Sequence, residues 1–146
     1  MAHILFVDDD RYFASVYLSC LQDYHTVTVR YEAETAVQEL SNNPEIVAVV
    51  LDMMMPPPDG CAHETHDGVT TGLWILDQCR QTLIDRRIAV LIFTNRGLSY
   101  VNTELAFIGL DPNLCQVSAK SAIDAEDLPH TVSKLIDRRN LDLTRG

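Results

Sequence analysis

The chain has 146 residues, of which 47% are hydrophobic, and this is enough apolar material for the core of one compact domain. Its formal net charge of −10 argues against direct binding to nucleic acid or to anionic membranes, because both need clustered Lys and Arg side chains. The sequence lacks a signal peptide and any run of about eighteen apolar residues, so we expect a cytoplasmic protein without membrane insertion.

Five short apolar runs alternate with helical patterns along the chain, at 3 to 7, 26 to 30, 46 to 51, 88 to 93 and 114 to 118. Helical periodicity is clearest after the first run and near the end, and weaker helices are expected at 33 to 41, 72 to 83 and 98 to 109. This alternation is typical of a parallel sheet covered by helices on both faces. We expect one domain over residues 1 to 140 and a polar, frayed C-terminal tail over 141 to 146.

The composition of each run indicates its place in the sheet. The first, third and fourth runs are almost continuously apolar, as strands buried on both faces are, whereas TVTV and LCQV alternate polar with apolar residues. The second and fifth strands are therefore expected at the edges. The strand order 2-1-3-4-5 satisfies this pattern with right-handed crossovers, which is a doubly wound, flavodoxin-like α/β fold. In this order a ligand crevice opens at the carboxyl ends of strands 1 and 3.

Polar side chains follow the carboxyl ends of the strands, and in chain order they are Asp8, Asp9, Asp10, Asp52, Thr94, Asn95 and Lys120. Carboxylates that converge on one crevice repel each other unless a cation lies among them, and a set of hard oxygen ligands suits Mg²⁺. The sequence therefore predicts a divalent metal site. Lys120 and the hydroxyl of Thr94 add a positive charge and a donor, which a bound phosphoryl group requires.

In order and spacing, the motifs ILFVDDD, VVLDMMMP, LIFTN and SAK resemble the receiver domain of two-component response regulators, over nearly the whole chain. The resemblance implies that Asp52 accepts a phosphoryl group from the phosphohistidine of a sensor histidine kinase or of a phosphotransfer protein. The Mg²⁺ ligands that it implies are Asp8, Asp9, Asp52 and the backbone carbonyl of Met54. Of these, Asp9 would bind directly and Asp8 mainly through water.

The same resemblance implies that Lys120 holds a phosphoryl oxygen and that Thr94 turns to hydrogen-bond the phosphoryl group. We therefore expect a stand-alone receiver that signals by phosphorylation-dependent binding to another protein. It would not be an enzyme for external substrates, since it catalyses only its own phosphorylation and dephosphorylation. A phosphohydrolase with an Asp nucleophile usually has a second Asp two residues later, and Met54 stands there in this chain.

Three features depart from the family pattern. Ser121 follows Lys120 in place of the usual Pro, so the cis peptide bond that is frequent there is not implied. Val117 stands where the family has an aromatic residue that turns inward on activation. The positions that tune phosphoryl lifetime, two residues beyond Asp52 and Thr94, are occupied by Met54 and Arg96. These departures leave open a module that binds partners without phosphorylation. A receiver fragment of a longer regulator is a separate alternative.

The loop after Asp52 is about twelve residues longer than in the family, with an insert at about 60 to 71. Either Gly60 or Gly72 matches the glycine that begins the next helix in the family. The insert is poor in apolar residues, so we expect a mobile flap that governs phosphoryl lifetime or partner choice. A weaker alternative for the insert is a zinc site formed by Cys61, His63, Glu64, His66 and Asp67. Ligands so closely spaced within one loop are not typical of a closed zinc site.

Overall fold

The computed structural model describes residues 2 to 95 and 98 to 145. Its strands are β1 (His3–Val7), β2 (Thr26–Arg30), β3 (Ile46–Leu51), β4 (Ala89–Thr94) and β5 (Cys115–Ala119). Its α-helices are α1 (Arg11–Gln22), α2 (Ala33–Asn42), α3 (Thr71–Gln78), α4 (Arg80–Asp85), α5 (Leu98–Ile108) and α6 (Leu128–Arg145). Two short 3-10 helices flank the last strand, namely η1 (Pro112–Leu114) and η2 (Lys120–Ala122).

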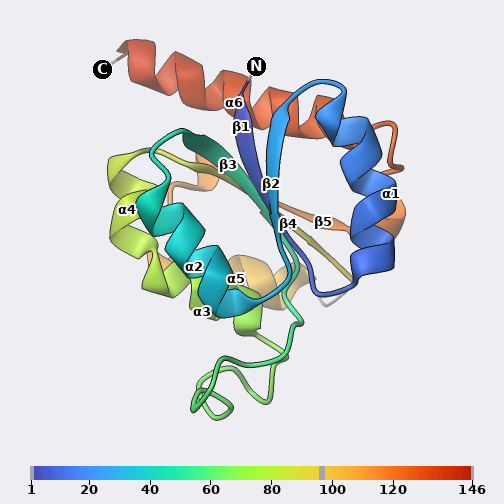
Figure 1. The fold of residues 1–146 in the computed structure, drawn as a ribbon. Helices are drawn as coiled ribbons and strands as arrows, with labels where there is room; N and C mark the ends of the chain where they lie inside the picture. The colour runs from blue at the N-terminus through green and yellow to red at the C-terminus, as the bar shows by residue number, and fades with distance from the viewer. Residues whose placement is uncertain (1, 96–97, 146) are drawn as a thin grey trace.

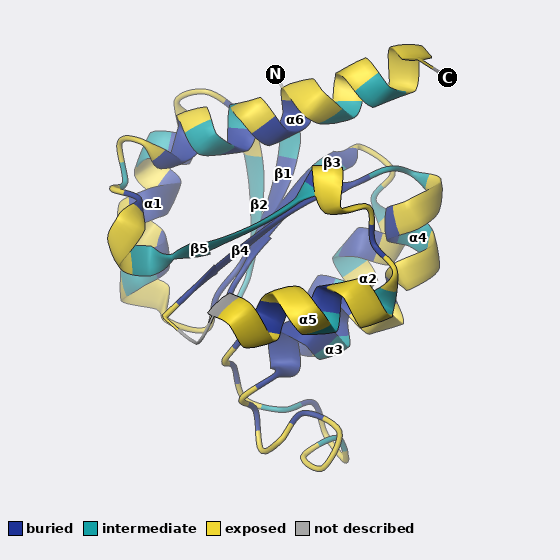
Figure 2. Ribbon diagram, turned by 180° about the vertical axis from the view of Figure 1, so that it is seen from behind, coloured by how far each residue is buried: buried dark blue, intermediate teal, exposed yellow. Residues whose placement is uncertain are grey.

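The strands form one parallel sheet in the order β2-β1-β3-β4-β5, which confirms the predicted topology. Figure 2 shows the burial that the composition of the strands predicted: the central strands are buried, and both edge strands are of intermediate burial. Helices cover the two faces of the sheet, with α1 and α6 on one side and α2 to α5 on the other (Figure 1). The carboxyl ends of β1 and β3 lie next to each other, as the predicted crevice requires.

Each face of the sheet has its own hydrophobic core. In β1, Leu5 and Val7 pack into the core under α2 to α5, whereas Ile4 and Phe6 pack into the core under α1 and α6. This division follows from the alternation of side chains along a strand. Both cores hold the central strands in place, so the residues that follow these strands leave the sheet at fixed positions.

The helix predicted over 72 to 83 is divided into α3 and α4 at Cys79. Arg86, just after α4, donates hydrogen bonds to the backbone carbonyls of Leu40, Asn43 and Ile46 at 2.7 to 2.9 Å. Carbonyl groups at the end of α2 have no partner within their helix, and Arg86 supplies one. The start of β5 lies one residue later than predicted, because Leu114 closes the turn of η1.

In place of an irregular tail over 141 to 146, the structure continues α6 to Arg145, and fraying of this end stays a prediction. Near the end of this helix, Asp142 binds the guanidinium of Arg87 at 2.6 Å. One turn earlier, Arg139 donates from Nε to the backbone carbonyl of Arg87 at 2.8 Å. The polar end of α6 is therefore held against the turn before β4 by ion pairing and hydrogen bonds, without an apolar face. None of the helices in the described ranges is long and apolar enough to span a membrane.

The long loop between β3 and α3 extends beyond the carboxyl edge of the sheet (Figure 1). Its own hydrogen bonds fold it into successive turns. The hydroxyl of Thr65, a fully buried residue, donates to the carbonyl of Cys61 at 2.8 Å, and the Thr70 N–H donates to the carbonyl of Thr65 at 2.9 Å. The loop therefore has a defined conformation around Thr65, and its mobility stays a prediction.

Candidate functional site

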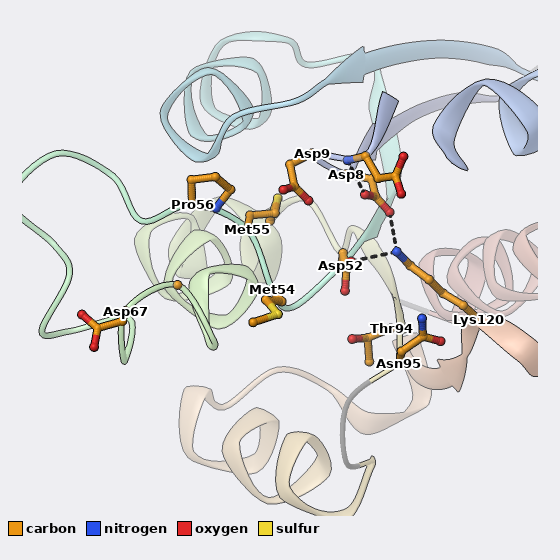
Figure 3. A pocket seen from close by; sticks show the side chains of 12 residues that line it. Asp8, Asp9, Asp52, Met54, Met55, Pro56, Asp67, Thr94, Asn95 and Lys120 are labelled. Carbon is orange, nitrogen blue, oxygen red and sulfur yellow. Dashed lines mark hydrogen bonds and ion pairs between the residues drawn. The ribbon is translucent and has the colours of Figure 1, made fainter. Parts of the chain in front are cut away.

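The polar residues that the sequence placed at the strand ends lie together in one pocket of about 610 Å³ (Figure 3). It is lined by Asp8, Asp9, Asp10, Asp52, Met54, Met55, Pro56, Asp67, Gly68, Thr94, Asn95 and Lys120. All the predicted site residues are in this set. The pocket opens where the strand order reverses, between β1 and β3, which is the usual ligand position in this type of sheet.

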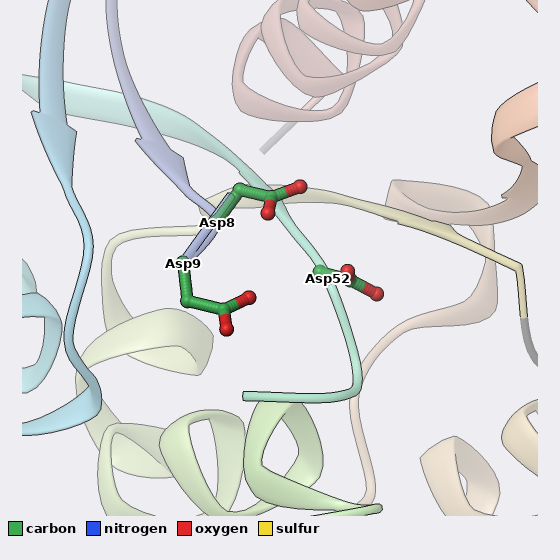
Figure 4. A group of neighbouring side chains, drawn as sticks. All are labelled: Asp8, Asp9 and Asp52. Carbon is green, nitrogen blue, oxygen red and sulfur yellow. The ribbon is translucent and has the colours of Figure 1, made fainter. Parts of the chain in front are cut away.

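Three carboxylates form the acidic side of the pocket (Figure 4). Asp8, Asp9 and Asp52 each offer an oxygen within 4.8 Å of the others, and no other such group was found among the described residues. Burial raises the pKa of Asp8, and hydrogen bonds from Lys120 oppose this shift. Burial also raises the pKa of Asp9, with a further contribution from the charge of Asp52. Oxygen ligands that lose hydration and repel one another fit a hard divalent cation.

Asp10 has a structural role in this cluster. Its side chain accepts a hydrogen bond from the Phe13 N–H at 3.0 Å and so caps the first turn of α1. Its own N–H donates to the carboxylate of Asp8 at 2.9 Å. Asp10 therefore fixes where α1 begins and orients Asp8, while Asp8 and Asp9 remain directed toward the pocket.

Asp52 is held by backbone contacts on both sides. Its N–H donates to the carbonyl of Val7 at 3.1 Å, and its carboxylate accepts from the Met53 N–H at 2.7 Å. Gly72, at the start of α3, donates its N–H to the carbonyl of Met53 at 2.9 Å. A Cβ on Gly72 would lie 2.3 Å from the carbonyl oxygen of Asp52. Gly72, and not Gly60, is thus the glycine that the helix needs for its close approach to the Asp52 loop.

Lys120 joins the two sides of the pocket. Its Nζ lies 2.8 Å from a carboxylate oxygen of Asp52 and 2.9 Å from one of Asp8. Burial favours the neutral amine, but hydrogen bonds to Asp52 and Asp8 outweigh it and raise the pKa of Lys120. The ammonium group is therefore charged at neutral pH and compensates part of the charge of the acidic cluster.

An aromatic cluster behind Lys120 is a part of the site that the sequence did not reveal. Nζ of Lys120 lies 4.0 Å from the ring centroid of Phe13, within the range of a cation–π interaction. The Phe13 ring packs at a tilt against Tyr17 and Phe93, with ring centroids 4.6 and 5.8 Å away, and the Tyr17 hydroxyl donates to the carbonyl of Ile123 at 2.8 Å. Phe13 fits the helical period of α1, which by itself is typical of a residue that packs against the core. The signal in the sequence for a second role, contact with the site, is that Phe13 follows the acidic residues Asp8 to Asp10 by one helical turn.

Of the remaining predicted residues, Thr94 and Met54 also line the pocket. Thr94 is fully buried at the end of β4, and the side chain of Met54 is 42% exposed at the mouth. Val117 pairs with Ile92 in the sheet and packs against the core under α2 to α5. Arg96, expected to tune phosphoryl lifetime, lies outside the described residues.

The insert contributes directly to the pocket, because Asp67 and Gly68 line it. The carbonyl of Gly68 accepts a hydrogen bond from the Met55 N–H at 3.2 Å, and the Thr71 hydroxyl donates to the carbonyl of Met55 at 2.8 Å. Gly68 has a φ of +96°, and a Cβ there would lie 2.5 Å from the carbonyl oxygen of Met55. In the described ranges, the Cys and His residues of the insert do not form a metal-binding group.

Comparison with known proteins gives a match in structure but none in sequence. No protein-family model and no curated protein matches this chain. A signal receiver domain of a putative LuxO repressor protein from Vibrio parahaemolyticus matches 99% of this chain and 98% of its own, with 21% identity and a TM-score of 0.73. A response regulator receiver domain protein from Clostridium thermocellum matches 97% and 98%, with 24% identity and a TM-score of 0.71.

A receiver domain protein described as CheY-like, from Methanospirillum hungatei, matches 97% of this chain and 98% of its own, with 16% identity and a TM-score of 0.73. These similarities concern the path of the chain and the order of its elements. The chain therefore has the fold of response regulator receiver domains, over nearly its whole length.

Proposed function

We propose that this chain is a cytoplasmic response regulator whose Asp52 accepts a phosphoryl group from a histidine kinase or a phosphotransfer protein. Phosphorylation would change its affinity for another protein. The observation that carries the proposal is the position of Lys120, whose Nζ lies within 2.9 Å of both Asp52 and Asp8 at the rim of an acidic pocket. A nucleophilic carboxylate, a fixed cation and a hard-ligand cluster are the groups that phosphoryl transfer to an Asp requires.

The chain's own residues account for the transfer step. An oxygen of the Asp52 carboxylate attacks the phosphorus atom in line, and the bond from phosphorus to the imidazole nitrogen of the donor breaks as the new bond forms. The ammonium group of Lys120 is placed to hold a phosphoryl oxygen beside Asp52. The oxygen ligands that would hold Mg²⁺ are those of Asp8, Asp9, Asp52 and the backbone carbonyl of Met54. A Mg²⁺ ion held by these groups would neutralise charge on the transferring oxygens.

The response to phosphorylation would begin at Thr94, whose hydroxyl is at the end of β4 beside the pocket. A new phosphoryl group offers it strong acceptor oxygens, and the loop that follows β4 would move with it. Val117 occupies the aromatic position of the family, so this loop would carry the signal without an aromatic switch. We expect no turnover of external phosphate esters, because Met54 cannot act as an acid or base.

Intact mass measurement after incubation with acetyl phosphate tests the proposal. In the presence of Mg²⁺ the wild-type protein should gain one phosphoryl group, and EDTA or Asp52→Asn should prevent the gain. Asp59→Asn is a matched control, because Asp59 is an exposed carboxylate in the same loop and does not line the pocket. Normal labelling of Asp52→Asn would refute the assignment of the nucleophile.

Binding of Mg²⁺ separates the roles of the two sides of the pocket. Asp9→Ala should weaken Mg²⁺ affinity by roughly tenfold, about 1.4 kcal/mol, because a hard cation loses a charged ligand. Lys120→Ala should retain Mg²⁺ binding and instead slow the labelling of Asp52, because it removes the cation beside the nucleophile. Equal losses of Mg²⁺ affinity in both variants, measured by calorimetry, would contradict these roles.

A further inference from the structure

A second groove, of about 380 Å³, lies between α3, α5 and the insert. The two helices run beside each other in both views, with the insert at one end of them (Figures 1 and 2). The groove is distinct from the Asp52 pocket, since none of the residues that line it is shared with that pocket. It therefore has to be explained separately from phosphoryl transfer.

Three aromatic side chains line the groove. Phe107 is 82% exposed and Tyr100 is 50% exposed, both on α5. Across the groove, Trp74 on α3 is half-buried and packs against the hydrophobic core. Large apolar side chains that gather at one surface are typical of a contact site for another molecule.

Carboxylates from the insert and from both helices line the same groove, namely Glu64, Asp77 and Glu104. None of the ion pairs found within residues 2 to 95 and 98 to 145 involves any of the three. His66 is the other titratable side chain that lines the groove besides Tyr100. The groove thus combines aromatic side chains with an acidic rim in a chain of net charge −10.

We propose that this groove binds a basic amphipathic helix of a partner protein. Apolar side chains of such a helix would cover Trp74 and Phe107, while its Lys and Arg side chains would reach the carboxylates at the rim. The aromatic rings also favour cations, because Lys and Arg bind over their faces. Nucleic acid and anionic membrane surfaces are unsuitable occupants, because their phosphates would face the acidic rim. The groove is present without phosphorylation, so this proposal does not depend on the chemistry of Asp52.

The groove carries its own reporter, because Trp74 is the only tryptophan in the chain. The probe is a synthetic helical peptide of Lys and Leu at amphipathic spacing, which contains neither Trp nor Tyr. A peptide with Glu in place of Lys is the control for charge. Titrated into the full, unphosphorylated chain, the Lys–Leu peptide should change the fluorescence of Trp74 with saturation, and the Glu–Leu peptide should not.

Two substitutions test where the peptide binds. Glu104→Lys should lower the affinity for the Lys–Leu peptide by about tenfold, because it places like charges together at the rim. Phe107→Ser should do the same by removing apolar contact, and the fold should persist because this ring is 82% exposed. The matched control is Asp137→Lys, which changes the net charge equally on the exposed face of α6, across the sheet.

Equal binding of the Glu–Leu and Lys–Leu peptides would overturn the proposal. An equal loss of affinity in Asp137→Lys and Glu104→Lys would also overturn it, because this result would indicate nonspecific attraction to an acidic protein. Sedimentation of the chain alone tests a second copy as the occupant. A dimer that Phe107→Ser dissociates would also overturn the proposal, since the groove would then be an interface between copies of this chain.

Discussion

Replacing Gly72 with alanine should both destabilise the fold and slow the phosphorylation of Asp52. A Cβ at this position would lie 2.3 Å from the carbonyl oxygen of Asp52 and 2.9 Å from Cα of Met53. The first distance is roughly 1 Å shorter than ordinary van der Waals contact. Both neighbours are backbone atoms, so no side-chain rotation relieves the overlap, and the Asp52 loop has to move away from α3.

The size of the effect follows from two opposing contributions. Overpacking in a well-packed region costs about 1–3 kcal/mol, and an overlap with backbone belongs at the upper end of that range. Restriction of the unfolded chain returns about 0.4–1 kcal/mol. The free energy of unfolding should therefore fall by about 2 kcal/mol. A displacement of the nucleophile by about 1 Å from Lys120 should also reduce the labelling rate by roughly a hundredfold.

Gly60→Ala is the matched control within the same loop. Gly60 has a φ of +77°, and no atom lies within 4 Å of the Cβ position, so the substitution should cost about 1 kcal/mol of backbone strain and leave labelling unchanged. Urea unfolding followed by Trp74 fluorescence gives the stability, and mass measurement with acetyl phosphate gives the rate. Wild-type stability and labelling in Gly72→Ala would refute the conclusion that close packing of α3 positions Asp52.

Three further predictions follow from the structure. Phe13→Leu should lower the labelling rate of Asp52 several-fold, through loss of a cation–π interaction of about 1 kcal/mol with Lys120, whereas Phe13→Tyr should label normally because it keeps the ring. Burial lowers the pKa of His25 below its ordinary value of 6.5, so the unfolded state binds the proton more readily, and the contribution of His25 to the free energy of unfolding should be lost as the pH falls below 6.5; His25→Gln should remove this part of the pH dependence in urea titrations, and an unchanged slope would contradict it. Residues 63 to 66 can be replaced with one glycine, because the Asp67 N–H donates to the Ala62 carbonyl across this segment. The shortened protein should label normally at Asp52 but bind the Lys–Leu peptide more weakly, because Glu64 and His66 are lost from the groove. A shortened protein that is folded by circular dichroism but cannot be labelled would show that residues 63 to 66 are needed for the chemistry.

The topology and the acidic pocket could be predicted because both depend on local patterns. The alternation of TVTV and LCQV follows from edge positions in the sheet, and the continuous apolar runs follow from burial on both faces. Because all the strands are parallel, every residue just after a strand must lie at the carboxyl edge of the sheet. This is why Asp52 and Lys120, 68 residues apart, could be placed together before any contact between them was seen.

The features that could not be predicted depend on contacts between distant segments. Arg87 and Asp142 are 55 residues apart, and nothing in the polar sequence near the C-terminus indicates that an ion pair extends α6. The choice between Gly60 and Gly72 likewise required the distance to the Asp52 carbonyl. Phe13 fitted the helical period of α1 as well as any core residue does, and only the structure shows Lys120 over its ring.

The insert connects the Asp52 pocket to the groove between α3 and α5. His66 lines the groove, while the next two residues, Asp67 and Gly68, line the Asp52 pocket. Gly68 is hydrogen-bonded to Met55, which also lines that pocket, so a shift of the Asp52 loop on phosphorylation would be passed to the edge of the groove over a few covalent bonds. Coupling of this kind is reciprocal, because the factor by which phosphorylation changes partner affinity must equal the factor by which the partner changes the equilibrium of phosphorylation. A longer loop at this position therefore offers a route from Asp52 to a binding surface that does not need an aromatic residue in place of Val117.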